Sequence, residues 1–188
     1  PDPEPPFFPN CSFNYDTIES RLRELGYLNP GITIRLKDER VEGREETFFS
    51  EGGINDYLAW INRTEDPLHP AIFVSDSKDG VEVQVSMQYI NEETERIRGY
   101  SNNIHNPGGG THISGLRTAL TRTIGAYANK QNMVKESTNL QGDDFREGLT
   151  AIVNLRAPHP QYNNQAKEKL TTAEIEGIVS SIVSDKLA

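Results

Sequence analysis

Three consecutive glycines, Gly108–Gly110, run directly into a segment with helical spacing and are the first candidates for chemistry. Glycine loops that open helices often hold phosphate, because free backbone N–H groups point outward there. A P-loop requires Gly-Lys-Ser/Thr after its last glycine, whereas Thr111 and His112 follow here. Contiguous glycines do not match the dinucleotide-binding pattern either. We therefore predict a structural turn that leads into a helix, with a phosphate cradle as the alternative.

The histidines and paired acidic residues give weak signals for catalysis or metal binding. Metal-ligand spacing is not seen among the histidines, which are His69, His105, His112 and His159. His112 could be a general base, but we favour a capping or packing role. Asp143 and Asp144 are interpreted as acids that serve the dipole of a short helix, with a metal role as the alternative. No metal site is predicted.

A polar, amide-rich loop at residues 158–170 follows a predicted strand, precedes a predicted helix and carries Lys167. A lysine on such a loop is usually only solvated, so the residue pattern alone does not assign it a role. Tyr162 is the one apolar anchor of residues 159–169. The polar composition of residues 159–169 therefore predicts a mobile loop.

Composition limits the classes of protein that the chain can represent. The 188 residues are enough for one domain with a substantial core, and the net charge of −9 argues against a generic basic nucleic-acid binder. Cys11 is the only cysteine, so an intrachain disulfide is excluded and a reducing cytoplasm is favoured. Membrane-spanning runs and a signal peptide are not seen. Because the chain opens on Pro1 without a methionine, we expect a piece of a longer protein.

Hydrophobic spacing predicts an α+β domain with one antiparallel or mixed sheet and helices mainly on one face. Residues 1–12 are proline-rich and expected to be extended. Helices are predicted at residues 15–29, 52–62, 111–130 and from Thr171 onward. Strands are predicted at residues 32–38, 46–50, 71–77, 81–89, 99–104 and 149–158.

Local signals sharpen several of these elements. Asp79-Gly80 indicates a hairpin turn between two of the strands. Capping-box patterns start the first helix, at Asp16 with Glu19, and the last, at Thr171 with Glu174. The apolar stripe of the glycine-preceded helix is predicted to comprise Ile113, Leu116, Leu120, Ile124 and Tyr127.

Several stretches together resemble the B subunits of bacterial type IIA topoisomerases, DNA gyrase in particular. The resemblance covers residues 13–188 in order, and its stretches are "RLRELGYLNPGITIRLKDER", "FFSEGGINDYL", "SNNIHNPGGGTHISGLRTALTRT" and "GDDFREGLTAIVNLRAPHPQYNNQAKEKL". It implies that residues 1–188 form a single transducer domain excised from a longer subunit. It also implies a fold similar to ribosomal protein S5 domain 2, with a mixed sheet backed by helices and a left-handed βαβ crossover.

The resemblance implies specific roles for a few residues. In the family an N-terminal GHKL domain binds ATP and Mg²⁺, and a Gln-Thr-Lys loop of the transducer reaches that site. Gln165 and Lys167 match this loop, and Ala166 departs from its threonine. Arg117 matches an arginine that lines the cavity through which DNA passes, whereas Arg122 is interpreted as a packing or salt-bridge residue. The implied partners are the GHKL ATPase domain, a Toprim domain, the gyrase A subunit and double-stranded DNA.

The fragment alone is expected to be inactive and to hold no cofactor, since the ATP-binding domain lies outside it. Three alternatives stay open. One is the matching domain of the topoisomerase IV B subunit. Another is a free-standing RNA- or protein-interaction module of S5-like fold, disfavoured by the acidic charge. The third is a transducer of a mismatch-repair or chaperone ATPase, disfavoured by the Gln-x-Lys loop.

Overall fold

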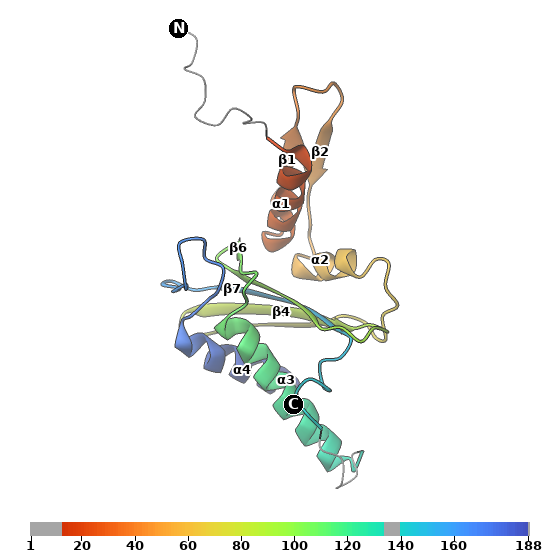
Figure 1. The fold of residues 1–188 in the computed structure, drawn as a ribbon, viewed down its shortest axis with the longest axis vertical. Helices are drawn as coiled ribbons and strands as arrows, with labels where there is room; N and C mark the ends of the chain where they lie inside the picture. The colour runs from red at the N-terminus through yellow and green to blue at the C-terminus, as the bar shows by residue number, and fades with distance from the viewer. Residues whose placement is uncertain (1–12, 134–139, 188) are drawn as a thin grey trace. The chain divides into compact units, whose positions relative to one another are not determined.

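The computed structural model describes residues 13–133 and 140–187, and the predicted extended segment 1–12 lies outside them. The chain divides into two compact units, residues 1–53 and residues 54–188. Figure 1 shows the elements of both units. Within the described part of the chain, every helix is too short or too polar to cross a membrane.

The first unit contains one helix and one two-stranded sheet. Helix α1 (Tyr15–Leu28) precedes the antiparallel strands β1 (Ile34–Lys37) and β2 (Glu45–Phe48). The predicted capping box is wrong, because the Asn14 side chain accepts the hydrogen bond from the Thr17 backbone N–H at 3.0 Å. Asp16 instead lies in the first turn of the helix, where its charge suits the helix dipole.

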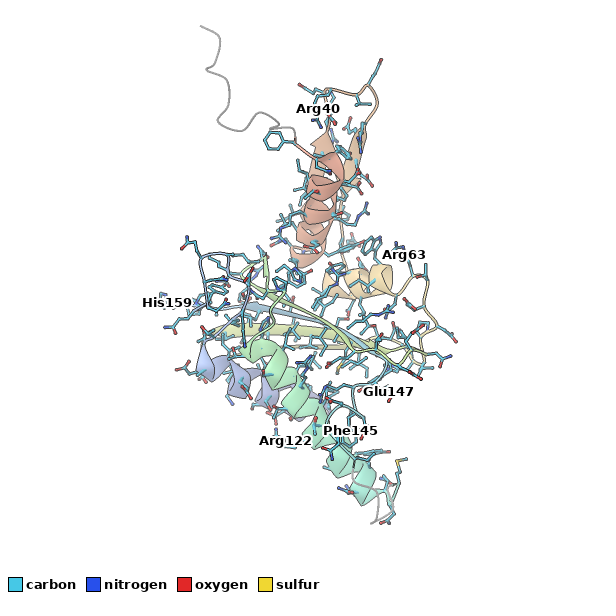
Figure 2. All side chains as sticks on the ribbon, in the orientation of Figure 1. Arg40, Arg63, Arg122, Phe145, Glu147 and His159 are labelled. Atoms are coloured by element: carbon cyan, nitrogen blue, oxygen red, sulfur yellow. The ribbon has the colours of Figure 1, made fainter. Side chains whose placement is uncertain are left out.

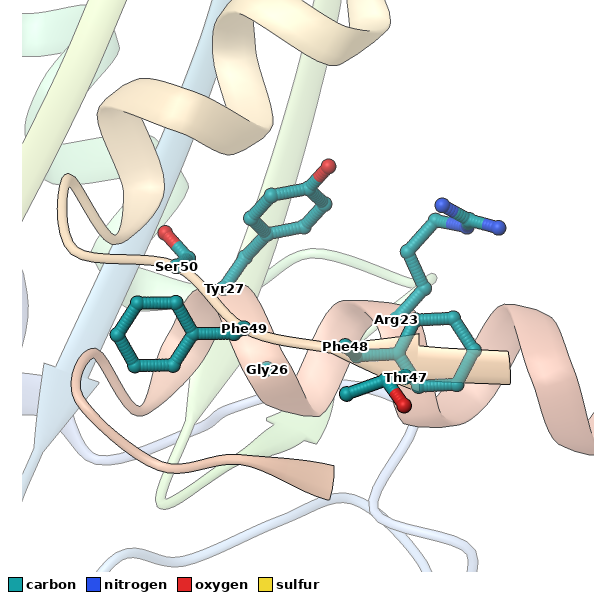
Figure 3. A pocket seen from close by; sticks show the side chains of 7 residues that line it. All are labelled: Arg23, Gly26, Tyr27, Thr47, Phe48, Phe49 and Ser50. Carbon is teal, nitrogen blue, oxygen red and sulfur yellow. The ribbon is translucent and has the colours of Figure 1, made fainter. Parts of the chain in front are cut away.

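A small pocket of about 90 Å³ lies between α1 and β2 in this unit. Figure 3 shows its lining residues, which are Arg23, Gly26, Tyr27, Thr47, Phe48, Phe49 and Ser50. A Cβ atom on Gly26 would lie 3.3 Å from the Cβ of Phe48, so the glycine lets the strand approach the helix closely. The pocket is too small for a nucleotide, since ligand sites usually enclose about 300–1,000 Å³.

The second unit is built on a five-stranded mixed sheet with strand order β3-β4-β7-β5-β6. The strands are β3 (Ile72–Lys78), β4 (Val81–Tyr89), β5 (Arg96–Ser101), β6 (Ile104–His105) and β7 (Leu149–Arg156). All neighbours pair antiparallel except β5 and β7, which pair parallel. This one parallel pair confirms a mixed sheet. The connection between β5 and β7 runs through β6 and helix α3 (Thr111–Lys130).

Helices cover both faces of this sheet. Helix α3 and helix α4 (Ala173–Leu187) pack on one face, where they bury the alternate residues Val81, Val83, Val85 and Met87 of β4. Helix α2 (Ile54–Ile61) lies on the other face, where the Ser86 hydroxyl donates to the Asn55 side chain at 2.6 Å. Strand β7 is therefore covered on both faces, and its residues are buried from Leu149 to Leu155.

The hairpin between β3 and β4 confirms the predicted turn. Asp79 and Gly80 both have positive φ angles, of 52° and 77°, as a tight hairpin turn of the type I′ kind requires. The predicted limits of α3, residues 111 and 130, also match the structure.

Three other predictions need correction. Tyr127 is 56% exposed, and Ala128 occupies the buried side of the last turns of α3 instead. Helix α4 begins at Ala173 rather than Thr171, and the Thr171 backbone N–H donates instead to the Gln161 carbonyl of the preceding loop. Strand β5 begins at Arg96 rather than at residue 99, since it pairs with β7 from that residue onward.

Candidate functional site

The Gln165-Ala166-Lys167 segment forms the exposed tip of a tight turn. The Lys167 backbone N–H donates to the Asn164 carbonyl at 3.1 Å, which places Gln165 and Ala166 at the two central positions. Its loop begins beside His159, whose side chain is labelled in Figure 2. An exposed turn of this kind can present a side chain to a ligand outside this unit.

Asparagine side chains brace the base of the turn. The Asn163 side chain accepts from the Lys169 backbone N–H at 3.0 Å, and the Asn163 N–H donates to the Lys169 carbonyl at 3.1 Å. The Asn164 side chain donates to the Glu168 carboxylate at 2.7 Å. The asparagine side chains of this polar loop therefore stabilise its turn through hydrogen bonds within the loop.

The glycine segment lies directly against this loop. The Gly108 N–H donates to the Glu168 carbonyl at 2.9 Å, the Leu170 N–H to the Gly109 carbonyl at 3.0 Å, and the Thr111 N–H to the Leu170 carbonyl at 3.1 Å. A Cβ atom on Gly110 would lie 2.2 Å from the Leu170 carbonyl oxygen. Residues 164–167 are hereafter called the lysine turn, and residues 108–111 are called its glycine bed.

The glycine bed bears on two of the sequence predictions. The structural turn that leads into a helix is the right interpretation, because the Gly108 and Thr111 N–H groups are bonded within the chain instead of being free for phosphate. The backbone of residues 159–169 is bonded to the bed on both sides of Lys169, while the mobility of this loop stays a prediction. Composition could not reveal this support because it comes from a distant segment.

Lys167 keeps an accessible charge on this anchored backbone. The residue is exposed, and its Nζ lies 5.5 Å from the centroid of the Tyr162 ring, within reach of a cation–π attraction. Across the residues that the structure describes, no ion pair is found for Lys167. Its charge is thus available to an anion.

Arg117, the predicted DNA-facing arginine, is paired with a carboxylate that sequence reasoning missed. Its Nε and an Nη donate to the two oxygens of Glu95 at 2.9 and 2.8 Å. Its side chain is 45% exposed, so the pair is screened by water. Glu95 also accepts from Arg146 at 3.0 Å, so one carboxylate serves two guanidinium groups.

Arg146 is the structural centre of the Gly-Asp-Asp segment. Its guanidinium donates to the Gly142 carbonyl, the Thr121 hydroxyl and the Asp143 carboxylate. The predicted short helix is absent from residues 142–148, which form turns, so the dipole role of Asp143 and Asp144 is wrong. In the part of the chain that the structure describes, no cluster of three or more His, Cys, Asp or Glu side chains is arranged to hold a metal ion.

Arg122 and the neighbouring segment have structural roles. Figure 2 labels Arg122 on α3, and Phe145 and Glu147 in the segment before β7. Arg122 donates to the Ser184 hydroxyl of α4 at 2.7 Å, which agrees with its interpretation as a packing residue. The Tyr89 hydroxyl donates to the Phe145 carbonyl at 2.6 Å.

His112 is fully buried, as the packing interpretation requires. Its ring lies against β5, where a Cβ atom on Gly99 would be 2.2 Å from Nε2. Both ring nitrogens lack a hydrogen-bond partner among the described residues. Burial therefore disfavours the charged ring and lowers the pKa of His112 to about 4.

The buried ring predicts a loss of stability in acid. The unfolded chain takes up a proton near pH 6.5 and the folded chain only near pH 4. The contribution of His112 to the free energy of unfolding is fully present above pH 6.5. It falls as the pH drops from 6.5 towards 4, by about 2 kcal/mol between pH 7 and pH 5. Urea unfolding of this chain at a series of pH values measures it. His112→Leu should flatten that slope and His159→Gln, an exposed control, should not; equal slopes in all three proteins would contradict the assignment.

The chain has relatives of known family along nearly its whole length. The family model for DNA gyrase B matches residues 53–188. The DNA gyrase B subunit of Haloferax volcanii is 41% identical over 98% of this chain, and that of Bacillus mycoides is 42% identical over 95%. The chain spans only 29% and 45% of these two relatives.

Solved structures agree with the sequence relatives. The 43K ATPase domain of Thermus thermophilus gyrase B has a TM-score of 0.83 at 32% identity, with 98% of this chain and 50% of that chain covered. A topoisomerase IV ATP-binding domain of Francisella tularensis has a TM-score of 0.82 at 22% identity, with 98% and 50% covered, and shares the fold. By its matched residues and its identity to these relatives, the chain belongs to the DNA gyrase B family.

Proposed function

We propose that residues 1–188 are the transducer domain of a gyrase B subunit and sense the γ-phosphate of ATP bound by another domain. The observation that carries this proposal is the exposed lysine turn, in which Lys167 is free of ion pairs among the described residues while its backbone is anchored. Gln165 lies at the same tip and would assist at the phosphate. Ala166 offers only a methyl group there, so the charge of Lys167 has the main role.

A lysine suits a switch of this kind. Its ammonium group is a compact cation, and its attraction to a terminal phosphate ends when that phosphate leaves. ATP and Mg²⁺ would be bound mainly by an N-terminal ATPase domain outside this chain. The fragment alone should hydrolyse no ATP, because the Gly108 and Thr111 N–H groups are bonded to the Glu168 and Leu170 carbonyls instead of being free for phosphate.

We also propose the finer fold, similar to ribosomal protein S5 domain 2. Support comes from the parallel pair β5–β7, from the passage of its connection through α3, and from the packing of α3 and α4 on one face. The left-handed sense of this crossover comes from the family resemblance alone. It runs against the usual right-handed rule for parallel connections.

Arg117 would handle DNA phosphate in the cavity between two B subunits. Its contact with Glu95 is half exposed, so a DNA phosphate can replace the carboxylate at modest cost. Further partners would be the Toprim domain and the gyrase A subunit. The cytoplasm is the proposed location, in keeping with a single cysteine in 188 residues.

Arg117→Gln in the intact subunit tests the coupling to DNA. We expect DNA-stimulated ATP turnover and supercoiling to fall several-fold, while turnover without DNA stays near wild type, because phosphate contacts add affinity without forming the ATP site. Arg122→Gln is the matched control, since this arginine lies on the same helix and bonds Ser184. Equal losses with and without DNA would show that Arg117 is structural.

A domain of the topoisomerase IV B subunit is the second candidate. It is favoured by the close structural match to the Francisella tularensis protein. The relaxation and supercoiling activities of the reconstituted enzyme separate the two, because the gyrase assignment requires negative supercoils to be introduced.

A further inference from the structure

A chain of hydrogen bonds runs from the Tyr162 ring to the backbone of Lys167. The Asn106 amide donates from Nδ2 to the Lys167 carbonyl at 2.7 Å, and its Oδ1 accepts from the Ser101 hydroxyl at 2.7 Å. The Ser101 hydroxyl has one proton and donates it to Asn106. Tyr162 is therefore the donor in the 3.0 Å contact between the Tyr162 and Ser101 hydroxyls. All donors in this chain therefore point towards Lys167.

The chain is built on a fixed part of the sheet. Ser101 ends β5 and is 0% exposed, and Asn106 follows β6 and is 1% exposed. The Asn106 N–H donates to the Gly99 carbonyl at 2.8 Å, and its own carbonyl accepts from the Gly109 N–H at 2.9 Å. The Asn106 backbone is thus fixed on the sheet, and its amide is oriented by the bonds that Oδ1 and Nδ2 make to Ser101 and Lys167.

The backbone that Asn106 holds is an unusual one for a lysine. Lys167 has a φ of +58°, a conformation that costs a non-glycine residue about 1 kcal/mol or more. Its carbonyl is fixed by Asn106, and its N–H is fixed by the Asn164 carbonyl. The N–H side of the same peptide is held within the turn, where the Glu168 N–H donates to the Asn164 side chain at 3.3 Å. Asn106 is the side chain that ties the carbonyl side to the sheet, at 2.7 Å, so its loss leaves this strained peptide held only from within its own loop.

We infer that Asn106 is a positioning residue that aims Lys167 at its phosphate, an inference that rests on the proposed γ-phosphate role. Asn106 does not touch the nucleotide; it acts through the Lys167 carbonyl. Charge stabilisation at a transferring phosphoryl group depends on a group held in place before reaction. A lysine whose backbone is unfixed must be ordered in each turnover, which lowers the rate.

A double-mutant cycle in the intact subunit tests this inference, with ATP turnover measured for Asn106→Ala, Lys167→Ala and the double variant. We expect Asn106→Ala to lower kcat about tenfold with the lysine present. In the Lys167→Ala background the same change should alter kcat less than twofold, because a residue acting through Lys167 has nothing left to aim. Independent, multiplying effects would overturn the positioning role.

Two further comparisons keep the outcomes distinct. Asn62→Ala is the control, since Asn62 is a buried asparagine that bonds Gln88 and should cost stability without affecting kcat. If Asn106→Ala does not fold, Tyr162→Phe removes only the hydroxyl at the far end of the chain and should lower kcat about threefold. Loss of turnover in Lys167→Ala with normal turnover in the Asn106 or Tyr162 variant overturns the inference alone. Normal turnover in Lys167→Ala overturns the γ-phosphate role as well.

Discussion

Lys167→Ala should lower ATP turnover of the intact subunit about a hundredfold or more, as the proposed γ-phosphate contact requires. The ammonium group can stabilise negative charge on the γ-phosphoryl group, and loss of one such preorganised donor typically costs 10²–10³ in rate, or about 3–4 kcal/mol. Steady-state turnover at saturating ATP measures the effect. Lys169→Ala is the matched control, because Lys169 is an exposed lysine two residues further along the same loop.

Lys167→Ala should have little effect on the stability of the fold. An exposed loop side chain contributes about 0.5 kcal/mol or less to stability, so the thermal unfolding midpoint should stay close to wild type. Turnover of Lys167→Ala within twofold of wild type would refute the role, and so would an equal loss in Lys169→Ala.

Gly110→Ala should unfold or severely destabilise the second unit. The added Cβ would lie 2.2 Å from the Leu170 carbonyl oxygen and 2.6 Å from its nitrogen, and both are backbone atoms that cannot move aside. The φ of +133° adds strain for any L side chain. We expect a loss of about 3 kcal/mol or more in the free energy of unfolding, measured by urea denaturation of this chain.

Gly177→Ala is the control for this experiment. Gly177 lies inside α4, and a Cβ atom there would meet nothing within 4 Å. Removing a glycine from a helix interior should stabilise the chain by about 0.5–1 kcal/mol. A Gly110→Ala chain as stable as wild type would mean that the glycine bed does not contact Leu170 in solution.

Local patterns predicted the elements whose information is local. The hairpin at Asp79-Gly80 and the limits of α3 followed from turn chemistry and from apolar spacing. Tyr127 was wrongly assigned to the buried stripe of α3, because helical spacing alone does not separate neighbouring positions such as Tyr127 and Ala128 near the end of a long helix. Lys167 and Arg117 were predicted from the family resemblance, since an exposed lysine and an exposed arginine have no distinctive local pattern.

Features that depend on distant segments were missed. Nothing near Gly108 in the sequence shows that its partner is Glu168, and nothing near Arg117 points to Glu95. The parallel pairing of β5 with β7 is likewise a property of the assembled sheet. The close approach at Gly110 could have been suspected from the glycine run itself, because such runs often mark a backbone that another backbone touches.

The bond between Asn106 and the Lys167 carbonyl also sets when the lysine turn is anchored. Asn106 and Lys167 are 61 positions apart, and the bond between them closes a loop that contains all of α3 and β7. Closure of a long loop is slow and is rewarded only when both ends are in place, so local hairpins and helices form earlier. A chain emerging from the ribosome should therefore have a folded β3–β4 hairpin well before Lys167 is anchored, so the proposed contact with ATP would become possible only among the last steps of folding.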